Sequence, residues 1–203
     1  MAVFITIVLA FYCMMSKHDL LQTFHTTNAF QWNEQTGFRL ASGRTSPFYI
    51  DCRIVLSHPG PRHLVAKLTY EHLQHVAFDL VGGLEIGAIP LATCISDYGY
   101  ATPSRREWRT FVVRKHAKDH GLGKLIEGTF SSGETALIVD DVFTTGGSLI
   151  KAADAARDAG LVVTHALVIV DRSEQEGQER LKEHGIQLVR LLTLDDLKNT
   201  QPT

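Results

Sequence analysis

Apolar and polar residues alternate in a regular order over the last two thirds of the chain. Short apolar, β-branched runs predict strands, and amphipathic stretches between them predict helices. The predicted strands are residues 77–82, 110–114, 136–139, 161–170 and 186–192. The predicted helices are residues 89–98, 149–159, 173–184 and 195–198. Strands that alternate with helices favour an α/β fold with a central, mostly parallel sheet and helices on both faces.

The first third of the chain has a different pattern. Residues 16–27 predict an amphipathic helix with Leu20, Leu21 and Phe24 on one face, and residues 59–76 predict a second helix with a proline near its start. Between these helices, residues 37–42 and 47–53 alternate like strands and are joined by 43–46. We expect a hairpin that caps the larger sheet, and we call residues 16–55 the hood.

Residues 1–15 are almost wholly apolar, but they are too few to span a bilayer. They lack the basic start and the cleavage site of a signal peptide. One explanation is that translation starts at Met14 or Met15, and the other is a hydrophobic helix packed on the protein or on a partner. We favour the first, which makes residues 16–203 a single domain behind an extension. The intact mass of protein from its native host would decide between them.

Composition narrows the class of protein. A chain of 203 residues with 44% hydrophobic residues suits one α/β domain. The formal net charge of −2 gives no reason to expect nucleic acid or an anionic membrane as a partner. Cys13, Cys52 and Cys94 are odd in number and far apart, which favours free thiols in a reducing cytoplasm.

The stretch from Glu134 to Ala152 carries the clearest chemistry. An apolar strand breaks at Asp140 and Asp141, passes through the loop 144–148 and becomes a helix. The glycines of this loop let the backbone approach a ligand, and the free N–H groups of the first helical turn attract a phosphate. The two carboxylates would repel phosphate, so they should face sugar hydroxyls or a cation carried with the ligand. The stretch therefore predicts a site for a phosphorylated sugar.

Four turns with polar or glycine residues follow predicted strands: 83–87, 114–120, 140–148 and 171–172. In open α/β sheets, ligands bind beyond the carboxyl ends of the strands. We therefore expect these turns to form one site.

Two acidic residues followed by Thr-Thr-Gly-Gly-Ser resemble the phosphoribosyl-diphosphate (PRPP) motif of the type I phosphoribosyltransferases. Paired acids after a strand also occur in receiver domains, near the N-terminus, and in Walker-B sites. The chain lacks the G-x-x-x-x-G-K-[ST] loop that a Walker-B site needs. We therefore prefer the phosphoribosyltransferase interpretation.

Three further segments resemble the orotate phosphoribosyltransferases in particular. Residues 38–51 are similar to the hood segment of that family, residues 111–121 to its basic strand and mobile loop, and Asp171-Arg172 to the position that contacts the orotate carboxylate. The resemblance covers about residues 16–192. It implies the type I phosphoribosyltransferase fold, the conversion of orotate and PRPP to orotidine 5′-monophosphate, Mg²⁺ held mainly through PRPP, and a homodimer with shared active sites.

The resemblance also implies the roles of individual residues. The predicted PRPP-binding residues are Arg114, Lys115, Lys118, His120, Asp140, Asp141, Val142, Phe143, Thr144, Thr145, Gly146, Gly147 and Ser148. The predicted catalytic residues are Lys118, His120, Asp140 and Asp141. The predicted orotate-binding residues are Thr144, Arg172, Tyr49 and Ile50. Arg172 suits a carboxylate because its planar guanidinium can donate two parallel hydrogen bonds.

The chain departs from the family pattern at three positions. Some members carry a lysine where this chain has Ala41, and many have a hydroxyl or basic residue where it has Glu85 and Ile86. Two other functions therefore stay open: a phosphoribosyltransferase for another base, and a PRPP-binding regulator without activity. His72 and His75 lie three apart on a predicted helix, and without a third ligand we interpret them as surface residues.

Overall fold

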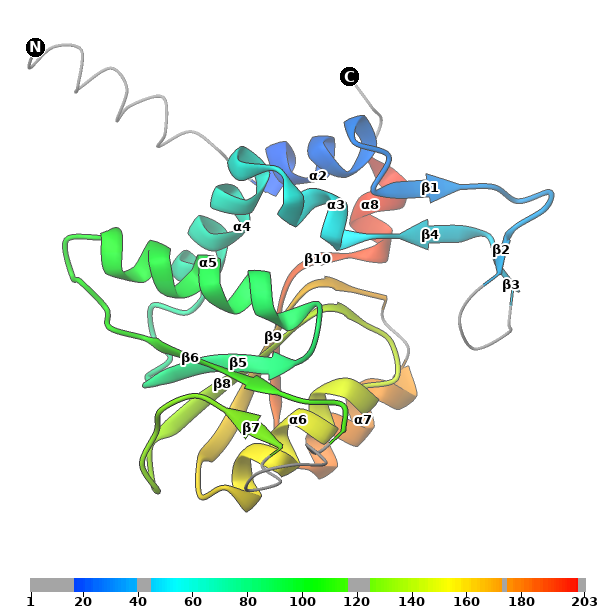
Figure 1. Ribbon diagram of the computed structural model, residues 1–203. Helices are drawn as coiled ribbons and strands as arrows, with labels where there is room; N and C mark the ends of the chain where they lie inside the picture. The colour runs from blue at the N-terminus through cyan, green and yellow to red at the C-terminus, as the bar shows by residue number, and fades with distance from the viewer. Residues whose placement is uncertain (1–16, 40–44, 117–124, 173–174, 201–203) are drawn as a thin grey trace, which may run out of the picture.

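The computed structural model describes residues 17–39, 45–116, 125–172 and 175–200 (Figure 1). Its centre is a sheet of six strands in the order β10-β9-β8-β5-β6-β7. These strands are β5 (Leu80–Leu84), β6 (Arg109–Val113), β7 (Ile126–Glu127), β8 (Thr135–Phe143), β9 (Val162–Asp171) and β10 (Gln187–Thr193). All neighbours are parallel except β7, which runs antiparallel to β6. The predicted α/β fold with a mostly parallel sheet is confirmed.

Helices cover both faces of this sheet (Figure 1). One face carries α2 (Lys17–Thr26), α3 (Cys52–Ser57), α4 (Pro59–His72), α5 (Ala88–Ala101) and α8 (Leu194–Asn199). The other face carries α6 (Gly147–Asp158) and α7 (Gln175–Glu183). Strand β8 contributes to both cores, because its successive side chains point to opposite faces. Leu137 and Val139 are buried in the first core, and Ala136 and Ile138 in the second.

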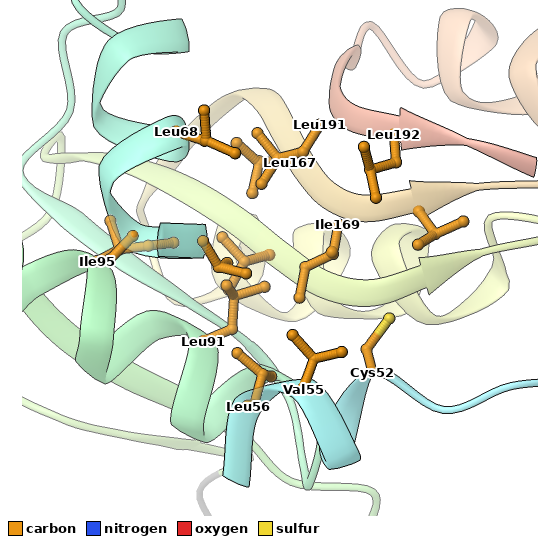
Figure 2. Packing of buried hydrophobic residues seen from close by; sticks show 14 of the residues in the cluster. Cys52, Val55, Leu56, Leu68, Leu91, Ile95, Leu167, Ile169, Leu191 and Leu192 are labelled. Atoms are coloured by element: carbon orange, nitrogen blue, oxygen red, sulfur yellow. The ribbon is translucent and has the colours of Figure 1, made fainter. Parts of the chain in front are cut away.

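The first core joins the hood to the sheet. Figure 2 shows Val55 and Leu56 of α3 beside Leu91 of α5 at the lower edge of the view, with Ile169 and then Leu167 of β9 above them. Cys52 belongs to the same cluster and is fully buried. Burial of these side chains fixes α3, and the strand β4 (Phe48–Ile50) that precedes it in the hood, against the carboxyl end of the sheet.

The order of the strands reverses beside β5. The chain passes from β5 to its neighbour β6, then returns with β8 to the other side of β5 before it continues to β9 and β10. A ligand site in a sheet of this type lies where the order reverses, beyond the carboxyl ends of the strands. The residues after β5 and β8 therefore lie at the expected position of a site.

The hood differs in detail from the predicted hairpin. Strand β2 (Phe38–Arg39) pairs with β3 (Thr45–Ser46), whereas β4 (Phe48–Ile50) pairs with β1 (Phe30–Trp32), a short strand that the sequence did not suggest. The expected strand 47–53 ends early because the Asp51 side chain accepts a hydrogen bond from the N–H of Arg53 and so begins helix α3.

Strand β8 is longer than predicted, and the expected break at Asp140 and Asp141 was wrong. Both residues belong to the strand, which pairs with β9 as far as Phe143. The neighbouring strand supplies ladder hydrogen bonds that offset the low strand propensity of aspartate. Strand β7 was also missed, and α4 ends at His72 rather than at residue 76.

Within the described ranges, no helix combines the length and the apolar character that crossing a membrane requires. The two explanations offered for residues 1–15 concern residues outside those ranges and stay predictions.

Candidate active site

The loop between β8 and α6 forms a small cavity of about 40 Å³ lined by residues 142–149 and Asp140. Gly146 precedes the helix with a φ of +77°, a backbone conformation that glycine adopts without strain. A Cβ at this position would lie 3.2 Å from the Phe143 ring. The first turn of α6 has no acidic residue, so its N–H groups can attract an anion. The cavity therefore has the chemistry of a phosphate site.

Helix α7 supports this loop from behind. Arg180 donates through Nη1 to the carbonyl oxygen of Thr145 at 3.1 Å. A Cβ on Gly177 would lie 2.5 Å from the carbonyl oxygen of Thr144, so the helix approaches the loop as closely as backbone allows. The sequence analysis did not anticipate this contact. Its only signal was a glycine inside a helical pattern, where glycine is unfavourable.

Asp140 and Asp141 lie at the end of β8. Oδ1 of Asp140 accepts from the N–H of Asp141 at 2.9 Å, and Oδ1 of Asp141 accepts from the N–H of Val142 at 2.9 Å. Gly87, just before α5, allows the approach of Asp141, because a Cβ there would lie 3.1 Å from the carboxyl carbon. Each carboxyl group is therefore held by the backbone N–H of the residue that follows it, and Asp141 also lies against the start of α5.

The environment of Asp140 opposes its ionised form. Burial raises the pKa of Asp140 from 3.8 to about 7, and the neighbouring charge of Asp141 adds to the effect. A group with this pKa changes its charge near neutral pH. Contact with ligand hydroxyls or with a cation would favour the ionised form.

A larger cleft of about 420 Å³ adjoins the phosphate cavity. Residues from the hood, from the turn after β5, from the end of β6 and from β8 line it: Ile50, Asp51, Arg53, Leu84, Glu85, Ile86, Gly87, Lys115, Asp140, Asp141, Val142 and Ser148. The two cavities share Asp140, Val142 and Ser148. Together they form one continuous site at the carboxyl end of the sheet.

Glu85, in the turn after β5, brings a carboxylate to a cleft that we expect to bind an anion. The carboxylate of Glu85 accepts a hydrogen bond from the N–H of Lys115 at 2.8 Å. The carbonyl oxygen of Lys115 accepts in turn from Nζ of Lys151 at 2.8 Å. The carboxylate of Glu85 therefore holds the backbone of Lys115, whose cationic side chain lines the cleft.

The basic segment after β6 is divided between two places. Lys115 lines the large cleft, whereas Arg114 lies 3.8 Å from Glu127 and lines a cavity of about 370 Å³ on the α6 side. Arg114 lines neither of the two cavities that Asp140 lines. Lys118 and His120 lie outside the described residues. The roles given to these three residues stay predictions.

Arg172 lies between the sheet and the hood. Its guanidinium carbon is 4.7 Å from the centre of the Phe48 ring in β4, the strand that also carries Tyr49 and Ile50. Its backbone N–H donates to the carbonyl oxygen of Phe143 at 3.1 Å, one residue before Thr144. The fold thus brings the hood strand, Arg172 and the phosphate loop together, as the prediction of a shared site requires.

Asp51 and Arg53 also line the cleft, and neither was among the predicted site residues. Gly87, which belongs to the predicted turn 83–87, lines it as well. Asp51 could have been suspected as a helix cap, but nothing in the sequence brings Arg53 and Lys115 to the same cleft. Among the described residues, no group of three or more His, Cys, Asp or Glu side chains could hold a metal ion.

The fold and the site define a class of protein. A family model described as "Phosphoribosyl transferase domain" matches residues 54–193, which span the sheet and the phosphate loop. The chain therefore belongs to the phosphoribosyltransferase family.

Relatives narrow this class further. The chain is 38% identical over 162 residues to an orotate phosphoribosyltransferase of Pyrococcus abyssi, covering 79% of this chain and 85% of the relative. The crystal structure of Mycobacterium tuberculosis orotate phosphoribosyltransferase with Fe(III) dicitrate superposes with a TM-score of 0.75 at 32% identity, covering 89% of this chain and 98% of that one. The same enzyme in complex with PRPP gives a TM-score of 0.72 at 30% identity, covering 90% and 98%. Within its family, the chain belongs to the orotate phosphoribosyltransferases.

Proposed function

We propose that the protein transfers the phosphoribosyl group of PRPP to orotate, which gives orotidine 5′-monophosphate and diphosphate in pyrimidine (UMP) biosynthesis. The observation that carries this proposal is the continuous site at the strand-order reversal. It combines the glycine-rich loop 144–148, the carboxylates of Asp140 and Asp141, and a cleft that Lys115 lines, with Arg172 over Phe48 of the hood. A solved relative in complex with PRPP supports the same substrate.

PRPP would occupy both cavities. The loop from Thr144 to Ser148 would hold the 5-phosphate through backbone N–H groups, with Val142 and Phe143 leading into it. Asp140 and Asp141 would accept hydrogen bonds from the ribose hydroxyls. Lys115 would meet the diphosphate in the large cleft.

Orotate would lie between the hood and the phosphate loop. The guanidinium of Arg172 can donate two hydrogen bonds to its carboxylate. Thr144 and the backbone of Tyr49 and Ile50 complete the predicted contacts. Because Arg172 stacks on Phe48, its charge is already directed toward the hood before orotate arrives.

The chemistry needs positioning and charge stabilisation. A ring nitrogen of orotate attacks the anomeric carbon of the ribose while the bond to the diphosphate oxygen breaks, so positive charge develops on the ribose and negative charge on the leaving group. Asp140 and Asp141 would stabilise the positive charge that develops on the ribose. Lys118 and His120 would stabilise the departing diphosphate, and His120 could give it a proton.

Mg²⁺ fits this site as a companion of the substrate. The two carboxylates at the end of β8 are oxygen ligands of the type that Mg²⁺ prefers, and they are too few to hold it alone. We infer that PRPP supplies most of its ligands. The ion contributes neutralisation of the diphosphate charge when it is bound.

We also infer a homodimer in the cytoplasm, with residues 16–203 as one domain. The turn of Arg114 away from its own cleft toward Glu127 supports an arrangement in which the basic segment also serves a second subunit. In such a dimer, Lys118 and His120 act in the neighbouring active site. Free, buried thiols at Cys52 and Cys94 suit a reducing compartment.

The proposed function is tested by incubating the purified protein with orotate, PRPP and Mg²⁺ and following the loss of orotate absorbance. We expect turnover, and we expect Asp141→Asn to reduce it strongly. A panel of other bases, including adenine, guanine and uracil, tests the alternative acceptors. Binding of PRPP without turnover of any base would favour a regulator instead.

A further inference from the structure

The large cleft is rich in negative charge. Four carboxylates line it, those of Asp51, Glu85, Asp140 and Asp141, and the side chain of Lys115 brings a positive charge to the same cleft. The exposed side chain of Ile86 lines the cleft but brings no charge. A diphosphate carries several negative charges, so the cleft needs another positive group.

Arg53 is placed to supply that charge. Among the described residues, Lys115 and Arg53 are the cationic side chains that line the large cleft, and they come from different elements. Arg53 belongs to the first turn of α3, just after the hood strand β4. The side chain of Arg53 is 65% exposed, so a ligand in the cleft can reach it.

Asp51 holds this guanidinium in one orientation. Oδ1 of Asp51 accepts from Nε of Arg53 at 2.8 Å, and Oδ2 accepts from Nη2 at 2.7 Å. Asp51 is itself held, because it accepts from the N–H of Arg53 at 3.0 Å and from the hydroxyl of Tyr49 at 3.2 Å. An arginine has five N–H donors, and this pair uses two of them. The remaining three stay outside the ion pair.

The other anionic groups of the two substrates have sites elsewhere. The 5-phosphate belongs to the loop 144–148, in a cavity that Arg53 does not line. The orotate carboxylate belongs to Arg172, which lies over Phe48 and does not line the large cleft. The ribose hydroxyls face the acids of β8. The diphosphate is the anion that remains for the cleft between Arg53 and Lys115.

We propose that Arg53 binds the diphosphate of PRPP opposite Lys115, and that Asp51 is the positioning residue that holds Arg53 in place. This inference rests on the proposed function, since it assigns one part of the same substrate. It gives the hood a direct role in binding the leaving group, in addition to its contacts with the base.

The test measures binding by calorimetry with two probes: PRPP with Mg²⁺, and ribose 5-phosphate, which has the same phosphate and ribose but no diphosphate. Replacing Arg53 by methionine keeps most of the stem and removes the charge. Loss of a charged hydrogen-bonding partner predicts about 10- to 100-fold weaker PRPP binding for Arg53→Met. Ribose 5-phosphate should bind within about twofold of wild type, because its own contacts remain. Arg53→Lys should recover part of the loss, because it restores the charge without the planar donors.

Arg105→Met is the matched control. Arg105 is also an exposed arginine held by a neighbouring side chain, the Tyr100 hydroxyl, but it lies beyond the far end of α5 from the cleft. PRPP binding should not change in this variant. Unchanged PRPP binding in Arg53→Met, or an equal loss for both probes, would overturn the inference. A wild-type protein that binds PRPP but converts no orotate would instead overturn the proposed activity alone.

A double-mutant cycle tests the role of Asp51. Asn keeps the ability to cap α3, so Asp51→Asn should change stability little. It should weaken PRPP binding in the wild-type background, and weaken it no further when Arg53 is already methionine. An equal effect of Asp51→Asn in both backgrounds would show that Asp51 acts independently of Arg53 and would remove its positioning role.

Discussion

Asp140 occupies a position at the end of β8 where burial and the charge of Asp141 both oppose its ionised form. In the proposed function, the same carboxyl group accepts hydrogen bonds from the ribose of PRPP. The free protein therefore carries an electrostatic cost that a ligand can offset. Replacing Asp140 should therefore stabilise the free protein and lower its activity.

Asp140→Asn should stabilise the free protein at high pH. The pKa of Asp140 is about 7 in the folded protein and near 3.8 in the unfolded chain, so the unfolded state loses its proton first as pH rises. The stability of the wild type therefore falls between about pH 4 and pH 7, and asparagine removes this loss. We expect a gain on the order of 4 kcal/mol at pH 8 and little at pH 4, measured by chemical denaturation.

The control is Asp154→Asn, an exposed carboxylate on α6 whose side chain is 52% exposed. It should change stability little at either pH. A gain for Asp140→Asn that is the same at pH 4 and pH 8 would show that Asp140 is not the titrating group. Activity should fall in Asp140→Asn at every pH.

Arg172→Ala should weaken orotate binding specifically. The lost bidentate contact predicts a KM for orotate about 10- to 100-fold higher, with the KM for PRPP nearly unchanged. Lys198→Ala is the control, because Lys198 also lies over the Phe48 ring, at 5.7 Å, without being assigned to the substrate. Equal losses of orotate and PRPP affinity in Arg172→Ala would contradict the assignment.

At the scale of elements, the phosphate loop depends on α7, which lies behind it. Gly177→Ala would place a Cβ 2.5 Å from the carbonyl oxygen of Thr144, and a backbone atom cannot move aside independently. We expect a loss of about 1–3 kcal/mol of stability from overpacking and a clear loss of PRPP affinity, measured by denaturation and calorimetry.

Gly60→Ala is the matched control on another helix. No atom lies within 4 Å of a Cβ at Gly60, so alanine should be neutral or slightly stabilising there. If Gly177→Ala bound PRPP as well as the wild type, the support of the loop by α7 would not matter for binding.

Some of the strands were predicted from the sequence and others were missed, and the difference has a physical cause. Strands such as β8 and β9 were predicted because both faces are buried, which leaves a continuous apolar run. The continuation of β8 through Asp140 and Asp141 was not predicted, because it depends on pairing with β9, which lies later in the chain. Strands β1 and β7 have three and two residues, too few for a periodic pattern.

The same distinction applies to the site. The phosphate site predicted at the loop 144–148 rests on a local pattern, since strand, glycines and helix follow one another in the chain. Arg172 was proposed for orotate because it follows a strand and resembles a family position. Arg53 and Gly177 were missed because their partners, the cleft and Thr144, are distant in sequence and meet them only through the packing of α3 and α7.

At the scale of the whole molecule, the proposed dimer predicts complementation between two inactive variants. Lys118→Ala and Arg172→Ala should each have low activity. When their subunits are exchanged, half of the dimers contain both variants, and one of the two sites in each hybrid has all its residues. We therefore expect recovery to about a quarter of wild-type activity, measured with the orotate assay.

Size-exclusion chromatography with light scattering should show a mass of two chains before the exchange. Mixing Lys118→Ala with Asp141→Asn should restore activity in the same way, because Asp141 is assigned to the other set of residues. Low activity after demonstrated subunit exchange would place Lys118 in its own subunit's site.

The burial of Cys52 gives the molecule an internal reporter. Its thiol donates to the carbonyl oxygen of Asp141 at 3.7 Å, and burial raises its pKa well above 9.0. A thiol in this state reacts with alkylating or disulfide reagents only after the chain around it opens. In a protein with Cys13 and Cys94 replaced, the labelling rate of Cys52 would therefore report how often the hood separates from Asp140 and Asp141. A bound substrate should lower this labelling rate.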